Sequence, residues 1–118
     1  MWEPGPLKRH LHSWGYRMKK THTEAVDQLF EAVLSLKTKE ECYTFFEDIC
    51  TPNELASLSQ RFAVGLKLLQ KQTYQEISKT TGASTVTISR VNRLLSDENE
   101  GIEMAARRIG VEEADTEA

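Results

Sequence analysis

Apolar residues recur at steps of three and four along most of the chain, which is the spacing that places side chains on one face of an α-helix. No stretch alternates between apolar and polar residues for long enough to predict a strand. The period predicts helices at residues 23–36, 39–49, 52–70, 74–80, 85–95 and 98–109. The sequence therefore predicts an all-α domain over residues 21–110.

Three of these helices have a well-defined apolar face. In residues 23–36 it consists of Val26, Leu29, Phe30, Val33, Leu34 and Leu36. In residues 52–70 it consists of Leu55, Leu58, Phe62, Leu66 and Leu69, and in residues 98–109 of Ile102, Ala105, Ala106 and Ile109. Gly65 lies inside a predicted helix, where glycine costs about 1 kcal/mol relative to alanine. We interpret it as a point where another helix approaches closely.

Helix ends are marked by capping residues. Four predicted starts have the Thr-x-x-Glu spacing of a capping box, at Thr21–Glu24, Thr38–Glu41, Thr51–Glu54 and Thr73–Glu76. Pro52 stands at the first helical position, where its missing N–H is not needed. Gly82 and Gly110 stand where predicted helices end.

The two ends of the chain differ from the helical region. Residues 1–20 contain Pro and Gly without a helical period, and we expect a flexible basic extension there. Met18 directly precedes the first periodic segment and is an alternative candidate for the translation start. Residues 111–118 are acidic, and we expect a disordered tail. No apolar run has the length of a membrane span or a signal peptide, so we expect a cytoplasmic protein.

Charge is distributed in blocks along the chain, although the net charge is only −3. Residues 51–96 carry six Lys or Arg and two acids, whereas residues 97–118 carry two Arg and eight acids. An acidic total argues against a protein that coats nucleic acid without discrimination. The block at 51–96 nevertheless offers a local basic surface.

Residues 73–95, TYQEISKTTGASTVTISRVNRLL, have the pattern of a helix-turn-helix. Ile77 and the small Ser78 stand where the second helix crosses the first. Gly82 tolerates the positive φ that the turn requires. Ile88 and Val91 are spaced as apolar anchors of the second helix. These offsets predict a DNA-binding motif whose second helix lies in the major groove.

The exposed face of the second helix fits this interpretation. Small hydroxyl side chains allow its N-terminus to enter a major groove, and its free N–H groups favour phosphate. From the pattern we expect DNA contacts from Ser84, Thr85, Thr87, Ser89, Arg90 and Arg93. Three side chains are placed to hold the phosphate backbone from the flanks, namely Lys71, Gln75 and Lys79. The apolar period also places Val86 and Leu95 on the buried face.

The chain resembles a known family. Residues 51–95 resemble the tryptophan repressor, and residues 18–110 are similar to the related YerC/YecD group of small bacterial regulators. The carrying residues are Thr51-Pro52-Asn53-Glu54, Arg61, Leu68-Leu69, Gly82-Ala83 and Thr87-Ile88-Ser89-Arg90, with DQLFEAVLSLKTKEECYTFFEDICT at 27–51. The resemblance implies an intertwined, all-helical homodimer whose N-terminal helices interlock between subunits.

The resemblance also implies roles for individual residues. It places Thr85, Val86, Thr87 and Ser89 near base edges, and Gln75 and Ser78 near the flanking DNA. Since the apolar period instead buries Val86, two placements of that side chain stay open.

Arg61 and Arg90 match two arginines that hold the tryptophan corepressor in the repressor, one by stacking and one through the carboxylate. The sequence departs from the repressor at Val91, where the repressor has glycine, and at Leu94, where it has a polar residue. The connection between the helices at 52–70 and 74–80 is also one residue shorter. A branched side chain at Val91 would occupy volume that the indole needs.

We therefore expect no cofactor, and Arg61 and Arg90 are the candidates if L-tryptophan or another small corepressor binds. The alternative interpretation is that Arg61 pairs with an acid and Arg90 contacts phosphate.

The leading hypothesis is a homodimeric, sequence-specific transcriptional regulator that binds a DNA operator and acts as a repressor. The alternative is a helical protein-interaction module without direct DNA binding. We expect no enzyme, because no nucleophile–base pair or Gly-rich phosphate loop is present. We also expect no metal site, since Cys42 and Cys50 lack a metal-ligand spacing.

Overall fold

The computed structural model describes residues 20–97, 99–111 and 113. Between Glu24 and Arg108 the described backbone forms six helices and no strand, which confirms the predicted all-α fold. The extension and the acidic tail expected at the two ends lie outside the described residues, apart from Lys20, Val111 and Glu113. None of the described helices is long and apolar enough to cross a membrane.

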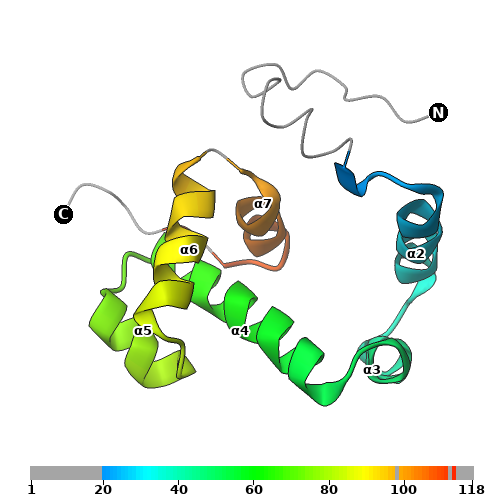
Figure 1. Ribbon diagram of the computed structural model, residues 1–118, viewed down its shortest axis with the longest axis horizontal. Coiled ribbons are helices and arrows are strands. Elements are labelled where there is room, and N and C mark those ends of the chain that lie inside the picture. The colour runs from blue at the N-terminus through cyan, green and yellow to red at the C-terminus, as the bar shows by residue number, and fades with distance from the viewer. Residues whose placement is uncertain (1–19, 98, 112, 114–118) are drawn as a thin grey trace. The chain divides into compact units, whose positions relative to one another are not determined.

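The chain divides into two compact units, residues 1–49 and residues 50–118. The first contains α2 (Glu24–Ser35) and α3 (Lys39–Ile49). The second contains α4 (Pro52–Leu69), α5 (Tyr74–Thr81), α6 (Thr85–Ser96) and α7 (Gly101–Arg108), labelled in Figure 1. Within the second unit α4 packs against α5, α6 and α7, and α5 packs against α6.

The predicted helix bounds agree with the structure to within one residue, except at the start of the last helix. That helix begins at Gly101 rather than at residue 98. The backbone and side-chain amides of Asn99 both donate to the Leu94 carbonyl, at 3.3 and 2.9 Å. These two hydrogen bonds hold Asn99 against the end of α6, so Asn99 does not belong to the next helix.

Two of the four predicted capping boxes are complete, at Thr51–Glu54 and Thr73–Glu76. At Thr38 the hydroxyl accepts from the Glu41 N–H at 3.0 Å, but the Glu41 carboxylate accepts from the N–H of Lys37.

The box predicted at Thr21–Glu24 was wrong. Thr23 is the N-cap of α2, and its hydroxyl accepts from the Val26 N–H at 3.2 Å. Thr23 has the extended backbone that an N-cap requires and directly precedes the first helical residue.

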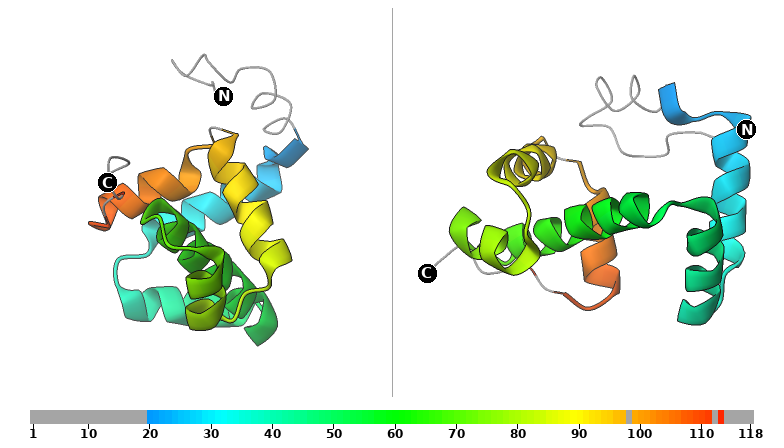
Figure 2. Two further views of the ribbon diagram at one scale, coloured as in Figure 1. Left: turned by 90° about the vertical axis from the view of Figure 1, so that its left-hand side faces the viewer. Right: turned by 60° about the horizontal axis from the view of Figure 1, so that its bottom comes forward.

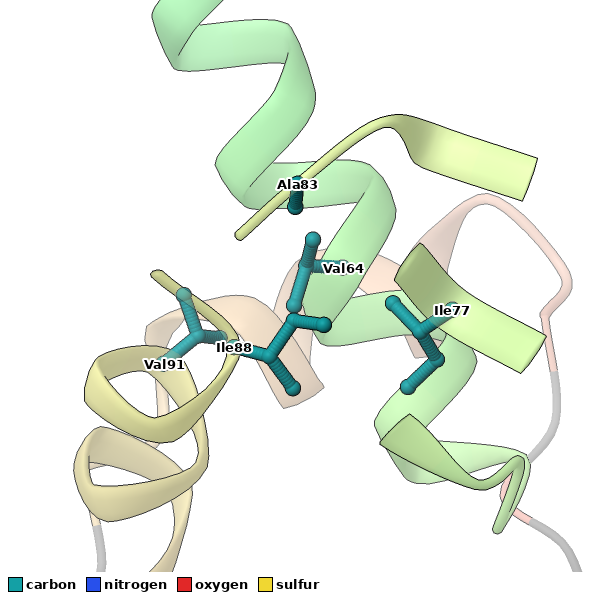
Figure 3. Close-up of a cluster of buried hydrophobic side chains, with 5 residues drawn as sticks. All are labelled: Val64, Ile77, Ala83, Ile88 and Val91. Carbon is teal, nitrogen blue, oxygen red and sulfur yellow. The ribbon is translucent and has the colours of Figure 1, made fainter. Parts of the chain in front are cut away.

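The core of the second unit is a small cluster of aliphatic side chains, each at most 1% exposed. Figure 3 shows them converging from α4, α5, the following turn and α6, as Val64, Ile77, Ala83, Ile88 and Val91. The predicted anchors Ile88 and Val91 are confirmed, and Leu95 is partly buried.

The placement of Val86 on this buried face was wrong, because its side chain is 64% exposed. Two residues before Ile88, it points about 200° around the helix axis from that anchor.

Helix α4 has two apolar stripes, and the sequence pattern identified only one. Of the predicted stripe only Leu69 is buried, while Leu58 is 46% exposed. The stripe that enters the core contains Val64, with Leu68 packed one turn later. The helical period of the apolar residues does not show which of the two stripes packs against other helices of the same chain.

Helix α4 ends in a Schellman motif built on a residue other than glycine. Lys71 has a φ of 64°, and its N–H donates to the Leu68 carbonyl at 3.0 Å. The Gln72 N–H donates to the Lys67 carbonyl at 3.1 Å, which completes the motif. A side chain in this conformation costs about 1–2 kcal/mol, so a lysine is not expected there and the turn could not be predicted.

The interpretation of Gly65 as a point of close approach is confirmed. A Cβ atom there would lie 2.8 Å from Ile102 Cγ2 of α7. In Figure 2, α7 lies beside α4 in both views. Glycine thus allows α7 to pack directly on the backbone of α4.

We expect Gly65→Ala to lower the free energy of unfolding by about 1–2 kcal/mol. An overpacked methyl group costs about 1–3 kcal/mol, and the better helix propensity of alanine returns up to about 1 kcal/mol. In an Ile102→Ala background the obstructing methyl is absent, so Gly65→Ala should be stabilising there. Urea denaturation at one fixed protein concentration measures both values. An equal loss in the two backgrounds would show that Ile102 is not the cause.

Candidate nucleic-acid interface

The predicted helix-turn-helix is formed by α5, a short turn and α6. Gly82 ends α5 with a φ of 75°, and its N–H donates to the Ser78 carbonyl at 2.9 Å. Two residues later Ser84 has an extended backbone and is the N-cap of α6. The positive φ at Gly82, which glycine adopts at little steric cost, therefore sets the direction of α6.

The turn is held by the side chains of Thr81 and Gln60. The Thr81 hydroxyl donates to the Ile77 carbonyl at 2.6 Å and accepts from the Ala83 N–H at 3.1 Å. The Gln60 side-chain amide of α4 donates to the Thr81 carbonyl at 3.2 Å. The turn is thus attached to α4 by a hydrogen bond as well as by the apolar core.

The sequence interpretation missed both residues. Gln60 lies one helical turn before Val64, so it would have been found only once the stripe of α4 that enters the core was known.

The first turn of α6 is capped by the hydroxyl of Ser84, a residue that the sequence pattern also predicted to contact DNA. Ser84 Oγ accepts from the Thr87 N–H at 3.2 Å, and its hydroxyl donates to Thr87 Oγ1 at 3.3 Å. Thr87 is half-buried, whereas the other residues proposed for this helix are exposed, namely Thr85, Val86, Ser89, Arg90 and Arg93.

Helix α6 has no acidic residue in its first turn. The other five described helices each carry one or two acids there. Such acids stabilise a helix by interacting with the positive end of its dipole. The N-terminus of α6 lacks this internal compensation, and apart from the capped Thr87 N–H its first N–H groups are available to an external anion.

The residues proposed to flank the DNA lie on α5 and just before it. Gln75, Lys79 and Lys71 are exposed. Ser78 is half-buried, and its carbonyl accepts the hydrogen bond of the turn.

Of the two arginines proposed for an effector, only Arg61 lines the hollow along α4. Arg61 lines an open hollow of about 430 Å³ along the first half of α4, together with Asn53, Glu54, Ser57 and Leu58. Its Nη2 donates to Ser57 Oγ at 3.1 Å, and it forms no ion pair within the described part of the chain. Arg90 is exposed on α6 and does not line this hollow.

Val91 also fails to line the hollow, because its side chain is 1% exposed and packs in the core. Glycine at this position would remove a core side chain. Elsewhere in the described residues, no three His, Cys, Asp or Glu side chains are grouped to hold a metal ion. Cys42 and Cys50 are free thiols.

This arrangement defines a small all-α protein with a helix-turn-helix. Residues 24–109 match the family model of the Trp repressor protein, and the chain belongs to that family. It is 49% identical over 102 residues to the uncharacterized protein YerC of Bacillus subtilis (strain 168), covering 86% of this chain and 96% of YerC. The resemblance to the YerC group is thereby confirmed.

Two crystal structures have the same fold. A TrpR-like protein from Eubacterium eligens ATCC 27750 is 54% identical, with a TM-score of 0.77, covering 80% of this chain and 98% of that one. A candidate Trp repressor from Staphylococcus aureus is 45% identical, with a TM-score of 0.78, covering 82% of this chain and 97% of that one.

We expect Thr81→Val to lower the free energy of unfolding by about 1–3 kcal/mol, because it leaves the Ala83 N–H without its partner in a partly buried turn. The adjacent Thr80→Val is a matched control. The Thr80 hydroxyl is exposed and donates to the Glu76 carbonyl at 3.0 Å, so its loss should cost less than about 0.5 kcal/mol. Denaturation at one protein concentration compares the two variants. Equal losses would show that the turn does not depend on Thr81.

Proposed function

We propose that this protein is a sequence-specific DNA-binding regulator that inserts α6 into the major groove as a homodimer. It would act in the cytoplasm as a repressor where its site overlaps a promoter. The observation that carries the proposal is the N-terminus of α6. It is free of acids, exposed, and followed on the same helix by Arg90 and Arg93.

Electrostatics support this choice of helix. Between Glu54 and Asp97 the only acid is Glu76, and its carboxylate accepts from the Thr73 N–H at 2.8 Å as part of a capping box. Four basic residues in and beside the motif are exposed, namely Lys71, Lys79, Arg90 and Arg93. Phosphate contacts by such residues release counterions, so affinity should fall steeply with salt.

The homodimer is supported by the first unit, whose helices bury no residue of their own. Leu34 is 84% exposed, and Phe30, Tyr43 and Ile49 are each more than half exposed. Exposed apolar surface of this extent marks an interface. A second copy of the chain is the occupant that the family resemblance favours, and two recognition helices would then contact half-sites about 34 Å apart.

We further propose that DNA binding needs no corepressor. Val91 belongs to the core, and Arg90 does not line the hollow beside Arg61. No enzymatic activity is part of the proposal.

Selection of binding sites from random double-stranded DNA by the full chain tests the function, with and without L-tryptophan. We expect one palindromic site in both arms, bound with an affinity that falls steeply as salt rises. Enrichment only with L-tryptophan would overturn the corepressor-free proposal. No enriched duplex, with salt-insensitive background, would overturn DNA binding and favour a protein-interaction module.

We expect Thr85→Asp to weaken binding to the selected site by roughly tenfold or more, because it brings a negative charge beside phosphates. The variant should be as stable as the wild type or more stable by about 0.3–1 kcal/mol, since the acid would interact favourably with the helix dipole. Fluorescence anisotropy and thermal denaturation give the two readouts.

Ser96→Asp is the control, because it makes the same charge change at the other end of α6. That end lies about 16 Å away, beyond the screening length of about 8 Å at physiological salt. The proposed docking of α6 is wrong if both variants bind DNA equally well.

We expect Leu34→Glu to raise the dissociation constant of the homodimer roughly a hundredfold, since it would bury an unpaired charge. Gln28→Glu adds the same charge at an exposed position of α2 and should leave the dimer intact. Sedimentation equilibrium measures both. A monomeric wild type would refute the homodimer directly.

A further inference from the structure

We propose that Val86 determines operator specificity by contacting the C5 methyl group of a thymine in each half-site. The inference rests on the proposed function and names one base that the recognition helix would select. The apolar period placed the Val86 side chain in the core, but this side chain is 64% exposed.

The position of Val86 on α6 keeps it out of the core. It is the second residue of the helix, directly after Thr85. The core anchors Ile88 and Val91 lie about 200° and 140° from it around the helix axis. No rotamer of a short branched side chain can reach the core from there, so its two methyl groups remain in solvent.

The neighbours of Val86 on α6 are polar. One helical turn further on lie Ser89 and Arg90, and both are exposed. On either side in sequence are Thr85, which is exposed, and Thr87, whose hydroxyl accepts from Ser84. A large contiguous apolar patch would mark a protein interaction site, whereas Val86 is a single apolar side chain among hydroxyl groups and cations of α6.

Double-stranded DNA presents a matching feature. In the major groove the thymine C5 methyl is the distinct apolar group among hydrogen-bond donors and acceptors. The cations on the same helix hold phosphates, and a valine in its first turn then lies at the depth of the base edges. Contact between the valine methyl groups and the thymine methyl removes apolar surface from water on both sides.

The test replaces thymine by uracil, which removes only the C5 methyl group. Each thymine of the duplex selected above is replaced in turn, and anisotropy gives the affinity of the full-length wild type and of Val86→Ala. We expect one position per half-site at which uracil weakens the wild type about fourfold per methyl group lost. Val86→Ala should bind the thymine and uracil duplexes equally at that position, so the methyl and the valine form a coupled pair.

Ile109→Ala is the matched control, because Ile109 is 62% exposed but lies at the end of α7. This variant should keep the full sensitivity to uracil. Val86→Ala should unfold at the wild-type temperature, since the side chain contributes little buried surface.

Two results would overturn the assignment while DNA binding stands. One is a wild type that is insensitive to uracil at every position, and the other is a Val86→Ala variant that keeps the wild-type sensitivity. Failure of the selection to enrich any duplex is a different result, which overturns the proposed function and this inference together.

Discussion

Contact between Val64 of α4 and the cluster formed by Ile77, Ala83, Ile88 and Val91 holds the second unit together. These side chains come from three helices and one turn, and each is almost completely removed from water. Each buried valine or isoleucine side chain contributes about 1.5–3 kcal/mol. The orientation of α6 therefore depends on a core so small that every methyl group in it matters.

The helices could be predicted from the sequence because two independent signals coincide. The apolar period defines each helix, and caps such as Thr51, Thr73 and Ser84 define where it begins. The helix-turn-helix followed from the same local chemistry, since Gly82, Ile88 and Val91 have roles that depend on spacing alone. Thr21 and Thr23 both precede α2, and the capping-box spacing did not identify Thr23 as its N-cap.

Packing between helices could not be predicted in the same way. Helix α4 carries apolar residues on two sides, and only the structure shows that Val64 enters the core while Leu58 stays exposed. The error at Val86 has a different origin, because its spacing of two residues from Ile88 and five from Val91 already places it on another side of the helix. The role of Gln60 and the left-handed turn at Lys71 were missed, because a polar residue inside a helix and a lysine in such a turn carry no local signal.

The N-terminal half of α6 departs from two local stability rules. Its first turn lacks an acid, and its second residue exposes an apolar side chain. Sequences tend to break such rules at functional sites and to compensate elsewhere. Here the compensation is visible in the turn, where Thr81 satisfies Ala83, and in Gln60, which attaches the turn to α4.

Helix α4 contacts the turn and the core on one side and lines an open hollow on the other. Gln60 and Val64 hold the turn and α6, while the hollow at Ser57 and Arg61 is open to solvent. Close-packed interiors transmit displacement instead of absorbing it. A displacement of α4 would therefore be passed to the turn and to α6 through Gln60 and Val64.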